Sequence, residues 1–205
     1  MHVHTIPDDD GLRTVASLGT PAFASELPDW LEDASEDGST AAFDAGHDGG
    51  YYRVSPDGGE ARLQTAFSLA PDAYDVVELA ARLRTSGEPV AASMGFEADG
   101  CVLSYDFAHE DSASADRIRA AGDGTSESVD ARVVDPEYEH EVVLRWEPAA
   151  GTAELLLDGT QAAVGKVGNL DPAVPHRAYW RASGDRGHLR IHTATIRYRE
   201  RSNPA

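Results

Sequence analysis

Three glutamates stand at alternate positions in the stretch EYEHE, where their carboxylates could do chemistry together. Side chains two residues apart in a strand point to the same side, so Glu137, Glu139 and Glu141 would share one face. Two carboxyl groups about 5 to 5.5 Å apart can hydrolyse a glycosidic bond, one as nucleophile and one as acid/base. In a chain with 36 acidic residues such a run is expected by chance. A solvated strand edge is therefore the favoured interpretation.

Two pairs of histidines could ligate a metal. His2 and His4 share one face of MHVHT, and His188 and His192 share one face of HLRIH. If the terminal strands pair, the four neutral imidazoles could converge, which would suit zinc or nickel. The inward apolar positions shift register near residues 192–195, which indicates a β-bulge that would separate the rings. Surface histidines are therefore favoured, and no metal site is predicted.

Aromatic rings with polar neighbours could hold a ligand by stacking and hydrogen bonding. Adjacent strand residues face opposite ways, so YYR at 51–53 and YWR at 179–181 each place at least one ring outside. Outward polar side chains of other strands would supply hydrogen bonds. No catalytic residue is predicted, and the predicted ligand-binding residues are Tyr52, Arg62, Gln64, Arg82, Ser104, Asp106, Tyr179 and Trp180.

The elements that must position these groups are β-strands, because apolar residues recur with a period close to two along almost the whole chain. ARLQTAFSL (61–69) predicts a half-buried strand. VAASMGF (90–96) and CVLSYDF (101–107), joined by EADG, predict a hairpin. DAYDVVELAARLRTSG (72–87) fits a helix or a strand, and the regular strand spacing on either side favours a strand.

A second hairpin is predicted by HEVVLRWEPAAGTAELLLDGT, residues 140–160. The alternation stops at Gly151, resumes, and stops again at Asp158 and Gly159. Turns at these points need backbone conformations that a Cβ atom opposes, which explains the glycines. TQAAVGKVGNL (160–170) predicts the return strand and its exit.

Two polar stretches predict long loops. These are DWLEDASEDGST (29–40) and AHEDSASADRIRAAGDGTSES (108–128), the second with one short edge strand around Ile118. Long loops on a rigid scaffold commonly carry binding residues. At 205 residues, an all-β chain of this kind is expected to form one domain, residues 1–205, a single β-sandwich.

The second hairpin also carries a resemblance to a known family. His-x-Val-x-Leu-x-Trp at 140–146, then Gly151, then Leu-x-Leu-Asp-Gly at 155–159 is similar to the central hairpin of the concanavalin A-like lectin and glucanase superfamily, particularly its laminin-G-like and pentraxin-like jelly rolls. Residues 177–200 resemble the last strands of such domains, which commonly pair with the N-terminal strand. The resemblance covers residues 40–200 and implies a two-sheet antiparallel jelly-roll sandwich, often with one concave face open to a ligand.

The resemblance implies several chemistries, because this fold hosts lectins, hydrolases, lyases and structural modules. Glycosidases of the superfamily carry Glu-x-Asp-x-x-Glu or Glu-x-Asp-x-Glu on a strand, whereas EYEHE lacks the central Asp. Jelly-roll polysaccharide lyases use an Arg, a Gln and a His–Tyr pair. Arg62 with Gln64 and His192 with Tyr198 supply these residue types without a recognisable motif.

Calcium is the usual inorganic partner of the family. Asp8 to Asp10, and Asp44 with Asp48, offer oxygen ligands but lack the spacing of a defined calcium loop. No cofactor is therefore predicted, with calcium as the open alternative.

The charge of the chain indicates its environment. The formal net charge is −19, with 36 acidic and 17 basic residues, and Lys166 is the only lysine. Carboxylates keep a surface hydrated in high salt, where the Debye length is about 3 Å at 1 M, so a halophilic archaeon or its virus is the predicted source. The carboxylates are spread along the chain, which disfavours a mimic of nucleic acid. No basic stripe with interleaved aromatics is present, so nucleic acid is not a predicted partner.

The cysteine count and the length of the apolar runs limit where in or outside the cell the chain is expected to be. Cys101 is the single cysteine and alternates with core positions, so it is expected to be a small buried hydrophobe. MHVHTIPDDD has no signal-peptide pattern, and no apolar run approaches 18 residues. The prediction is a soluble chain without membrane insertion, cytoplasmic or virion-associated, with a mature form that has lost its leader as the alternative.

The favoured function is a non-catalytic glycan-binding or interaction module adapted to high salt, with a glycan or a partner protein as ligand. The alternatives are a structural or receptor-binding component of a virion or large assembly, and a carbohydrate-active enzyme, either a glycoside hydrolase or a polysaccharide lyase. The oligomeric state is left open by the sequence.

The charge predicts that salt stabilises the folded chain. At low salt the −19 charge repels itself and opposes the compact state, and added ions screen that repulsion. The thermal midpoint, followed by circular dichroism, is expected to rise steadily from low to multimolar KCl. A neutral osmolyte at matched osmolality serves as the control and should stabilise less. A midpoint that does not depend on KCl would contradict the prediction.

Overall fold

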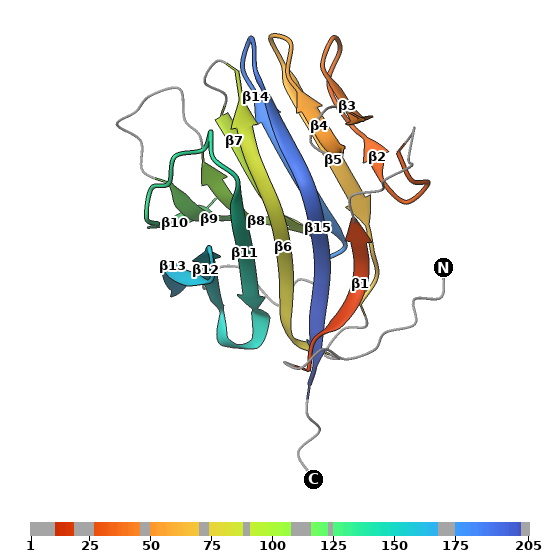
Figure 1. Cartoon of the computed structure of the whole chain (residues 1–205). Coiled ribbons are helices and arrows are strands. Elements are labelled where there is room, and N and C mark those ends of the chain that lie inside the picture. The colour runs from red at the N-terminus through yellow and green to blue at the C-terminus, as the bar shows by residue number, and fades with distance from the viewer. Residues whose placement is uncertain are drawn as a thin grey trace.

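Alternating side chains place the chain in two antiparallel sheets that pack face to face, as a computed structural model shows (Figure 1). The structure describes residues 11–18, 27–45, 50–69, 74–87, 91–107, 116–122, 125–167 and 175–201. The predicted fold class, an all-β jelly-roll sandwich of two antiparallel sheets, is confirmed.

Sheet A lies in front in Figure 1 and carries the long central strands. Its last strand pairs with the N-terminal strand β1, as the resemblance implies. In spatial order the sheet consists of β13 (Thr160–Lys166), β12 (Thr152–Leu157), β11 (His140–Glu147), β6 (Tyr74–Ser86), β15 (His188–Glu200), β4 (Tyr51–Ser55) and β3 (Thr40–Asp44), with β1 (Arg13–Leu18) also along β15.

Sheet B lies behind it. In spatial order it consists of β10 (Thr125–Asp130), β9 (Arg117–Gly122), β8 (Cys101–Phe107), β7 (Ala91–Ala98), β14 (Arg177–Ser183), β5 (Glu60–Ala66) and β2 (Glu32–Asp33). A short 3-10 turn, η1 (Pro148–Ala150), joins β11 to β12. Among the described residues, none belongs to a helix long and apolar enough to cross a membrane.

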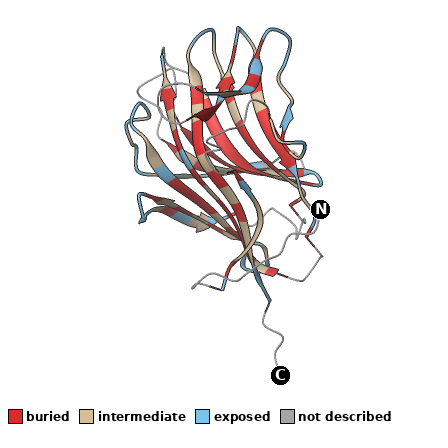
Figure 2. Cartoon of the chain, turned by 45° about the vertical axis from the view of Figure 1, so that its right-hand side comes forward, coloured by how far each residue is buried: buried red, intermediate tan, exposed pale blue. Residues whose placement is uncertain are grey.

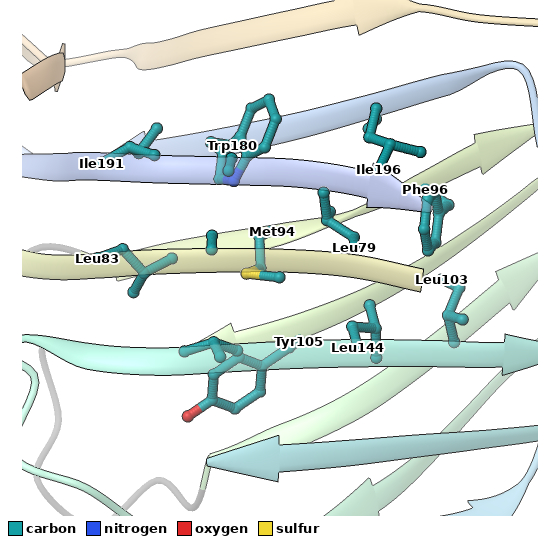
Figure 3. Packing of buried hydrophobic residues seen from close by; sticks show 14 of the residues in the cluster. Leu79, Leu83, Met94, Phe96, Leu103, Tyr105, Leu144, Trp180, Ile191 and Ile196 are labelled. Carbon is teal, nitrogen blue, oxygen red and sulfur yellow. The ribbon is translucent and has the colours of Figure 1, made fainter. Parts of the chain in front are cut away.

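The two inward faces form one continuous hydrophobic cluster. Buried positions run through the middle of both sheets (Figure 2), and large side chains from opposite sheets interlock between them (Figure 3). Trp146 and Leu79 come from sheet A, and Trp180 and Met94 from sheet B, each at most 1% exposed. Burial of one such side chain stabilises the fold by roughly 1.5 to 3 kcal/mol. The packing of the inward side chains therefore fixes which residues point outward on each sheet.

The hairpins predicted from the sequence are confirmed. β7 and β8 pair around Asp99 and Gly100, and β11 and β12 pair around η1. Gly151 and the Asp158–Gly159 turn take positive φ values of 60°, 52° and 72°, which explains the residues found there. The ambiguous segment 72–87 contains β6 and no helix.

The short strand predicted around Ile118 is present, but it lies between two other strands and not at an edge, and the rest of the predicted loop up to residue 128 is wrong. Residues 117–122 and 125–130 form the paired strands β9 and β10, and Ile118 is fully buried. Ile118 and Ala120 alternate inward between outward arginines, a pattern that small residues concealed in the sequence. Residues 108–115 lie outside the described part of the chain.

The bulge predicted near residues 192–195 is present. The pairing of β15 with β6 shifts between Ile191 and Thr193, so His192 is the extra residue. His188 and His192 both belong to the described residues, while His2 and His4 lie outside them.

A row of alternating charges crosses the outer face of sheet A. Glu78 on β6 is fully buried and forms ion pairs with Arg145 (2.7 Å) on one side and Arg197 on the other. Arg145 continues to Glu154, 3.4 Å away on β12. Each charge in this row therefore has an opposite neighbour, which compensates the loss of hydration.

Removal of the central charge of this row should destabilise the fold. Glu78→Gln leaves two arginines without their shared carboxylate, and breaking a buried pair typically costs about 3 to 5 kcal/mol. The matched control is Glu154→Gln at the outer end of the same row, where the side chain is 28% exposed and a smaller loss of about 1 kcal/mol is expected. Urea unfolding of both variants at one salt concentration measures the difference. Equal losses would show that the buried carboxylate has no special role.

Candidate functional site

The outer face of sheet B gathers most of the predicted ligand-binding residues. One cross-strand row places Gln64, Tyr179, Gly95, Ser104 and Arg119 directly opposite one another on β5, β14, β7, β8 and β9. These positions face outward because their strand neighbours fill the core. The row is the centre of the candidate site.

Gly95 makes room for the aromatic ring of this row. A Cβ atom at residue 95 would lie 2.2 Å from the carbonyl oxygen of Leu103, so no side chain fits there. Tyr179 on β14 and Ser104 on β8 lie opposite this glycine on its two sides. The glycine therefore leaves space between them for the Tyr179 side chain.

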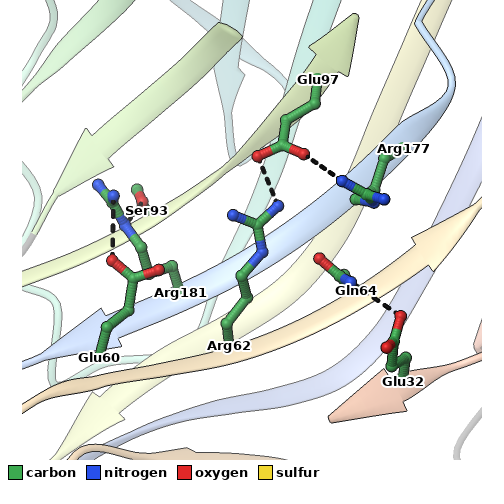
Figure 4. Close-up of polar contacts among 8 residues, drawn as sticks. All are labelled: Glu32, Glu60, Arg62, Gln64, Ser93, Glu97, Arg177 and Arg181. Atoms are coloured by element: carbon green, nitrogen blue, oxygen red, sulfur yellow. Dashed lines mark hydrogen bonds and ion pairs between the residues drawn. The ribbon is translucent and has the colours of Figure 1, made fainter. Parts of the chain in front are cut away.

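Arg62 covers this ring. Its guanidinium lies 4.6 Å from the centre of the Tyr179 ring, a cation–π geometry, and crosses β14 to reach Glu97 at 2.6 Å. Arg177 binds the other oxygen of Glu97 at 2.8 Å (Figure 4). Tyr179 is only 2% exposed, and burial raises the pKa of its phenol, so it stays neutral.

The other carboxylates of this face are also held by partners. Arg181 lies 3.4 Å from Glu60, and Gln64 donates a hydrogen bond to Glu32 at 2.8 Å (Figure 4). Asp106 lies 3.2 Å from Arg119 and accepts a hydrogen bond from Ser104 at 2.9 Å. In the described strands of sheet B, each outward face carries at most one carboxylate. The two-carboxylate strand pattern of the glycosidases is thus not found in these strands.

The acidic run at residues 137–141 lies elsewhere. Glu141 belongs to β11 of sheet A, and Glu137 and Glu139 precede that strand. Glu137 and Glu141 are exposed, as expected for a solvated edge. Glu139 forms an ion pair with Arg82 and lies 3.2 Å from Nε2 of His192.

The structure separates the predicted site residues into three groups. Arg62, Gln64, Ser104, Asp106 and Tyr179 lie together on the outer face of sheet B. Arg82 lies on the outer face of sheet A. The remaining two rings are in the core and are described next.

The placement of Tyr52 and Trp180 on a ligand face is corrected by the structure. They are 2% and 1% exposed and lie between the sheets, because Tyr52 is opposite Ile191 and Trp180 is opposite Leu63. The outward ring of the first pair is Tyr51, on sheet A. Inward and outward positions alternate along a strand, so the register in which the strand pairs with its neighbours decides which ring of each pair is buried.

Sequence reasoning missed part of the sheet B face. Glu97 and the arginines 119, 177 and 181 complete the contacts made by the predicted residues. Arg119 belongs to the short strand predicted around Ile118, but that strand was expected at a sheet edge and its outward residues were not assigned to the site. The alternation of Ile118 and Ala120 was the signal that could have placed Arg119 on the outer face.

A second aromatic cluster lies on the outer face of sheet A. Tyr51 donates a hydrogen bond to Asp44 at 3.0 Å and stacks on His188 with ring centres 6.4 Å apart. His192 lies 5.8 Å from the same ring. Tyr198, the predicted partner of His192 in a lyase, lies opposite inward Val77 and packs against the core. His192 therefore neighbours Tyr51 in place of Tyr198.

No metal cluster is found within the part of the chain that the structure describes. No three histidine, cysteine, aspartate or glutamate side chains there are grouped to hold an ion. The predicted calcium candidates Asp8 to Asp10 and Asp48 fall outside the described residues, while Asp44 pairs with Tyr51.

Comparison with solved structures identifies the fold as the concanavalin A-like jelly roll of lectins and glucanases. SCLam, a non-specific endo-β-1,3(4)-glucanase from family GH16, matches with a TM-score of 0.68 and 10% identity over 97% of this chain and 95% of its own. The Emp47p carbohydrate recognition domain matches at 0.65 and 13%, over 94% and 99%. The laminarinase catalytic domain from Thermotoga maritima MSB8 matches at 0.64 and 11%, over 94% and 100%.

At such low sequence identities the comparisons establish the fold and not the function. No protein-family model matches the chain, and no curated protein matches it. The class of protein is therefore defined by architecture, and function must be argued from the side chains of the two outer faces.

The contacts of Glu97 predict its titration. Partial burial acts to raise the pKa of this carboxyl, but hydrogen bonds and charges from Arg177 and Arg62 outweigh it, so the pKa lies below its ordinary value. A lowered folded-state pKa stabilises the fold above the unfolded pKa, and this contribution is lost as pH falls through the folded value. Arg62→Gln should raise the pKa of Glu97, as carbon-13 NMR of the carboxyl can measure. Arg181→Gln, whose guanidinium binds Glu60, should leave it unchanged.

Proposed function

We propose that this chain is a non-catalytic glycan-binding module and that the outer face of sheet B is its ligand site. The observation that carries the proposal is the planar guanidinium of Arg62, which lies over the buried ring of Tyr179 in a row of hydrogen-bonding side chains. Glycan sites contain a few fixed polar groups that orient the ligand by hydrogen bonds. The proposed site is formed by Arg62, Gln64, Ser104, Asp106, Arg119, Arg177 and Arg181, with Tyr179 beneath Arg62, in one sandwich domain spanning residues 1–205.

Unused donors on this face support the proposal. The Nε–H groups of Arg62 and Arg117 are buried and have no hydrogen-bond partner among the described residues, whereas Nε of Arg119 lies 3.2 Å from the Asp106 carboxylate. An unsatisfied buried donor costs about 1 to 3 kcal/mol, which an acceptor from a ligand or from water would recover. Sugar hydroxyl oxygens are suitable acceptors.

The carboxylates support binding without catalysis. Glycoside hydrolysis needs a carboxyl that holds a proton near neutral pH and a second one beside it. Glu97 is held ionised by two arginines, and Glu60 and Asp106 each face an arginine. In this arrangement a bound sugar would meet charge pairs that position it, and Glu97 is not the protonated acid that cleavage requires.

The structural neighbours fit a carbohydrate ligand. One is a carbohydrate recognition domain, and others are glucanases. We extend the proposal to high salt: a surface with net charge −19 and arginine as almost its only cation suits a halophilic archaeal or viral source.

The test is binding and turnover in one sample. A panel of neutral and acidic polysaccharides is titrated into the protein in multimolar KCl, with tryptophan fluorescence reporting binding and reducing ends reporting cleavage. Saturable binding without product is expected. Arg62→Gln should weaken it at least about tenfold, since a hydrogen bond from a charged group contributes about 1.5 to 3 kcal/mol.

The control is Arg199→Gln, the same charge change on the opposite sheet, where the side chain is 48% exposed. It should bind as the unaltered chain does. Release of product would replace the proposal by an enzyme, and failure of every glycan to bind folded protein would replace it by a role in an assembly.

A further inference from the structure

Three arginines form a row across the outer face of sheet A. Arg53 on β4 lies directly opposite Arg190 on β15, and Arg190 lies directly opposite Arg84 on β6. Side chains at such positions start about 4.5 to 5.5 Å apart, and like charges directly opposite destabilise a sheet. The repulsion among these three arginines therefore destabilises the sheet unless nearby or bound groups offset it.

The same face contains the alternating row described above. There, Arg197, Glu78, Arg145 and Glu154 succeed one another as opposite charges along four strands. Acidic residues outnumber basic ones about twofold in the chain, so carboxylates were abundant enough to fill the arginine row as well. Three successive cations are a departure from the pattern of this sheet.

The surroundings of the row compensate its charge only in part, through the Asp44 carboxylate 3.9 Å from Arg53. Arg190 lies 4.7 Å from the centre of the Tyr51 ring and donates a hydrogen bond from Nε to Nε2 of His188 at 2.8 Å. Burial, together with Arg53, Arg190 and Arg84, lowers the pKa of His188 to about 4 against the opposing charge of Asp44. The imidazole is thus neutral and adds no negative charge.

A pocket of about 390 Å³ opens beside the row, over β3 and β4. Arg53 forms one wall, and Thr40, Asp44 and Ser55 supply oxygen atoms. The hydroxyl oxygen of Ser55 is buried and has no hydrogen-bond partner among the described residues. The volume falls in the range of small-ligand sites, and the unused hydroxyl is a polar group without a role inside the fold.

We propose that the arginine row and this pocket form a second binding site, which takes a carboxylate-bearing sugar such as a uronate unit of an acidic polysaccharide. Arginine forks match a planar carboxylate with paired hydrogen bonds, and the anion relieves the repulsion along the row. Thr40, Ser55 and Asp44 fit the hydroxyls of the same sugar. The single carboxylate of Asp44 would repel a densely charged polyphosphate, which favours the singly charged sugar.

This inference goes beyond the glycan site proposed on sheet B and stands on different residues. The two sites point away from each other on opposite faces of the sandwich. Either can therefore fail while the other holds.

The experiment uses the full chain and a short oligogalacturonate, titrated by calorimetry at fixed KCl. Arg53→Gln, whose side chain is 46% exposed, should weaken binding at the sheet A site about tenfold. Arg199→Gln is the matched control, with the same charge change on the same sheet face at 48% exposure, and should bind as the unaltered chain does. Methyl esterification of the probe removes its charge and should abolish binding at this site.

Two further measurements separate a ligand role from a structural one. Ser55→Ala removes the unused hydroxyl and should weaken binding severalfold without lowering the urea midpoint. Oligogalacturonate should raise the pKa of His188 in NMR titrations, because an anion beside the imidazole stabilises its protonated form.

The outcomes are distinct. Loss of binding in Arg53→Gln with binding retained in Arg62→Gln supports the second site. Full affinity in Arg53→Gln, equal binding of the methyl ester, or no movement of the His188 pKa would each overturn it. Loss of all binding in Arg62→Gln alone would leave only the sheet B site.

Discussion

The strict alternation of side chains along paired strands is the constraint on which the rest of the structure depends. Each strand gives every second residue to the core, so Trp180 and Met94 pack inward while Tyr179 and Gly95, their chain neighbours, face out. A shift of register by one residue would exchange the two sets. The large inward side chains make that shift costly, and they thereby fix which polar groups meet on each outer face.

On these outer faces, charge pairing replaces apolar packing. Arginine is almost the only cation, and its planar guanidinium can bind a carboxylate while it lies flat over an aromatic ring, as Arg62 does between Glu97 and Tyr179. Such contacts bury a charged group while keeping it paired with an opposite charge or an aromatic ring. The two arginines also hold Glu97 in its ionised form, which suits binding better than proton transfer.

The sequence allowed the strands and turns to be predicted, because alternation and turn glycines are local signals. Two things were not local. YYR and YWR each contain adjacent rings, and the pairing of β4 and β14 with their neighbours decided that Tyr52 and Trp180 are inside. Arg62 and Arg82 are both arginines at outward positions of alternating strand sequences, yet they lie on different sheets. Sheet membership follows from the long-range topology of the chain. A short strand around Ile118 was predicted, but its partner β10 was not, because small and polar residues make a weak apolar pattern.

The two faces lead to one consequence for binding by the whole molecule. Packed sheets lie about 10 Å apart, but their outer faces point in opposite directions, so one short glycan cannot contact both Arg62 and Arg53. Two occupied faces would instead join separate stretches of polysaccharide. Effective concentration then makes a long acidic polymer bind more tightly than its fragments, although each site alone is modest. A sandwich with a charge-paired face and a cation-rich face would suit such bridging, because the two proposed sites differ in the anionic character of the sugar that they would accept.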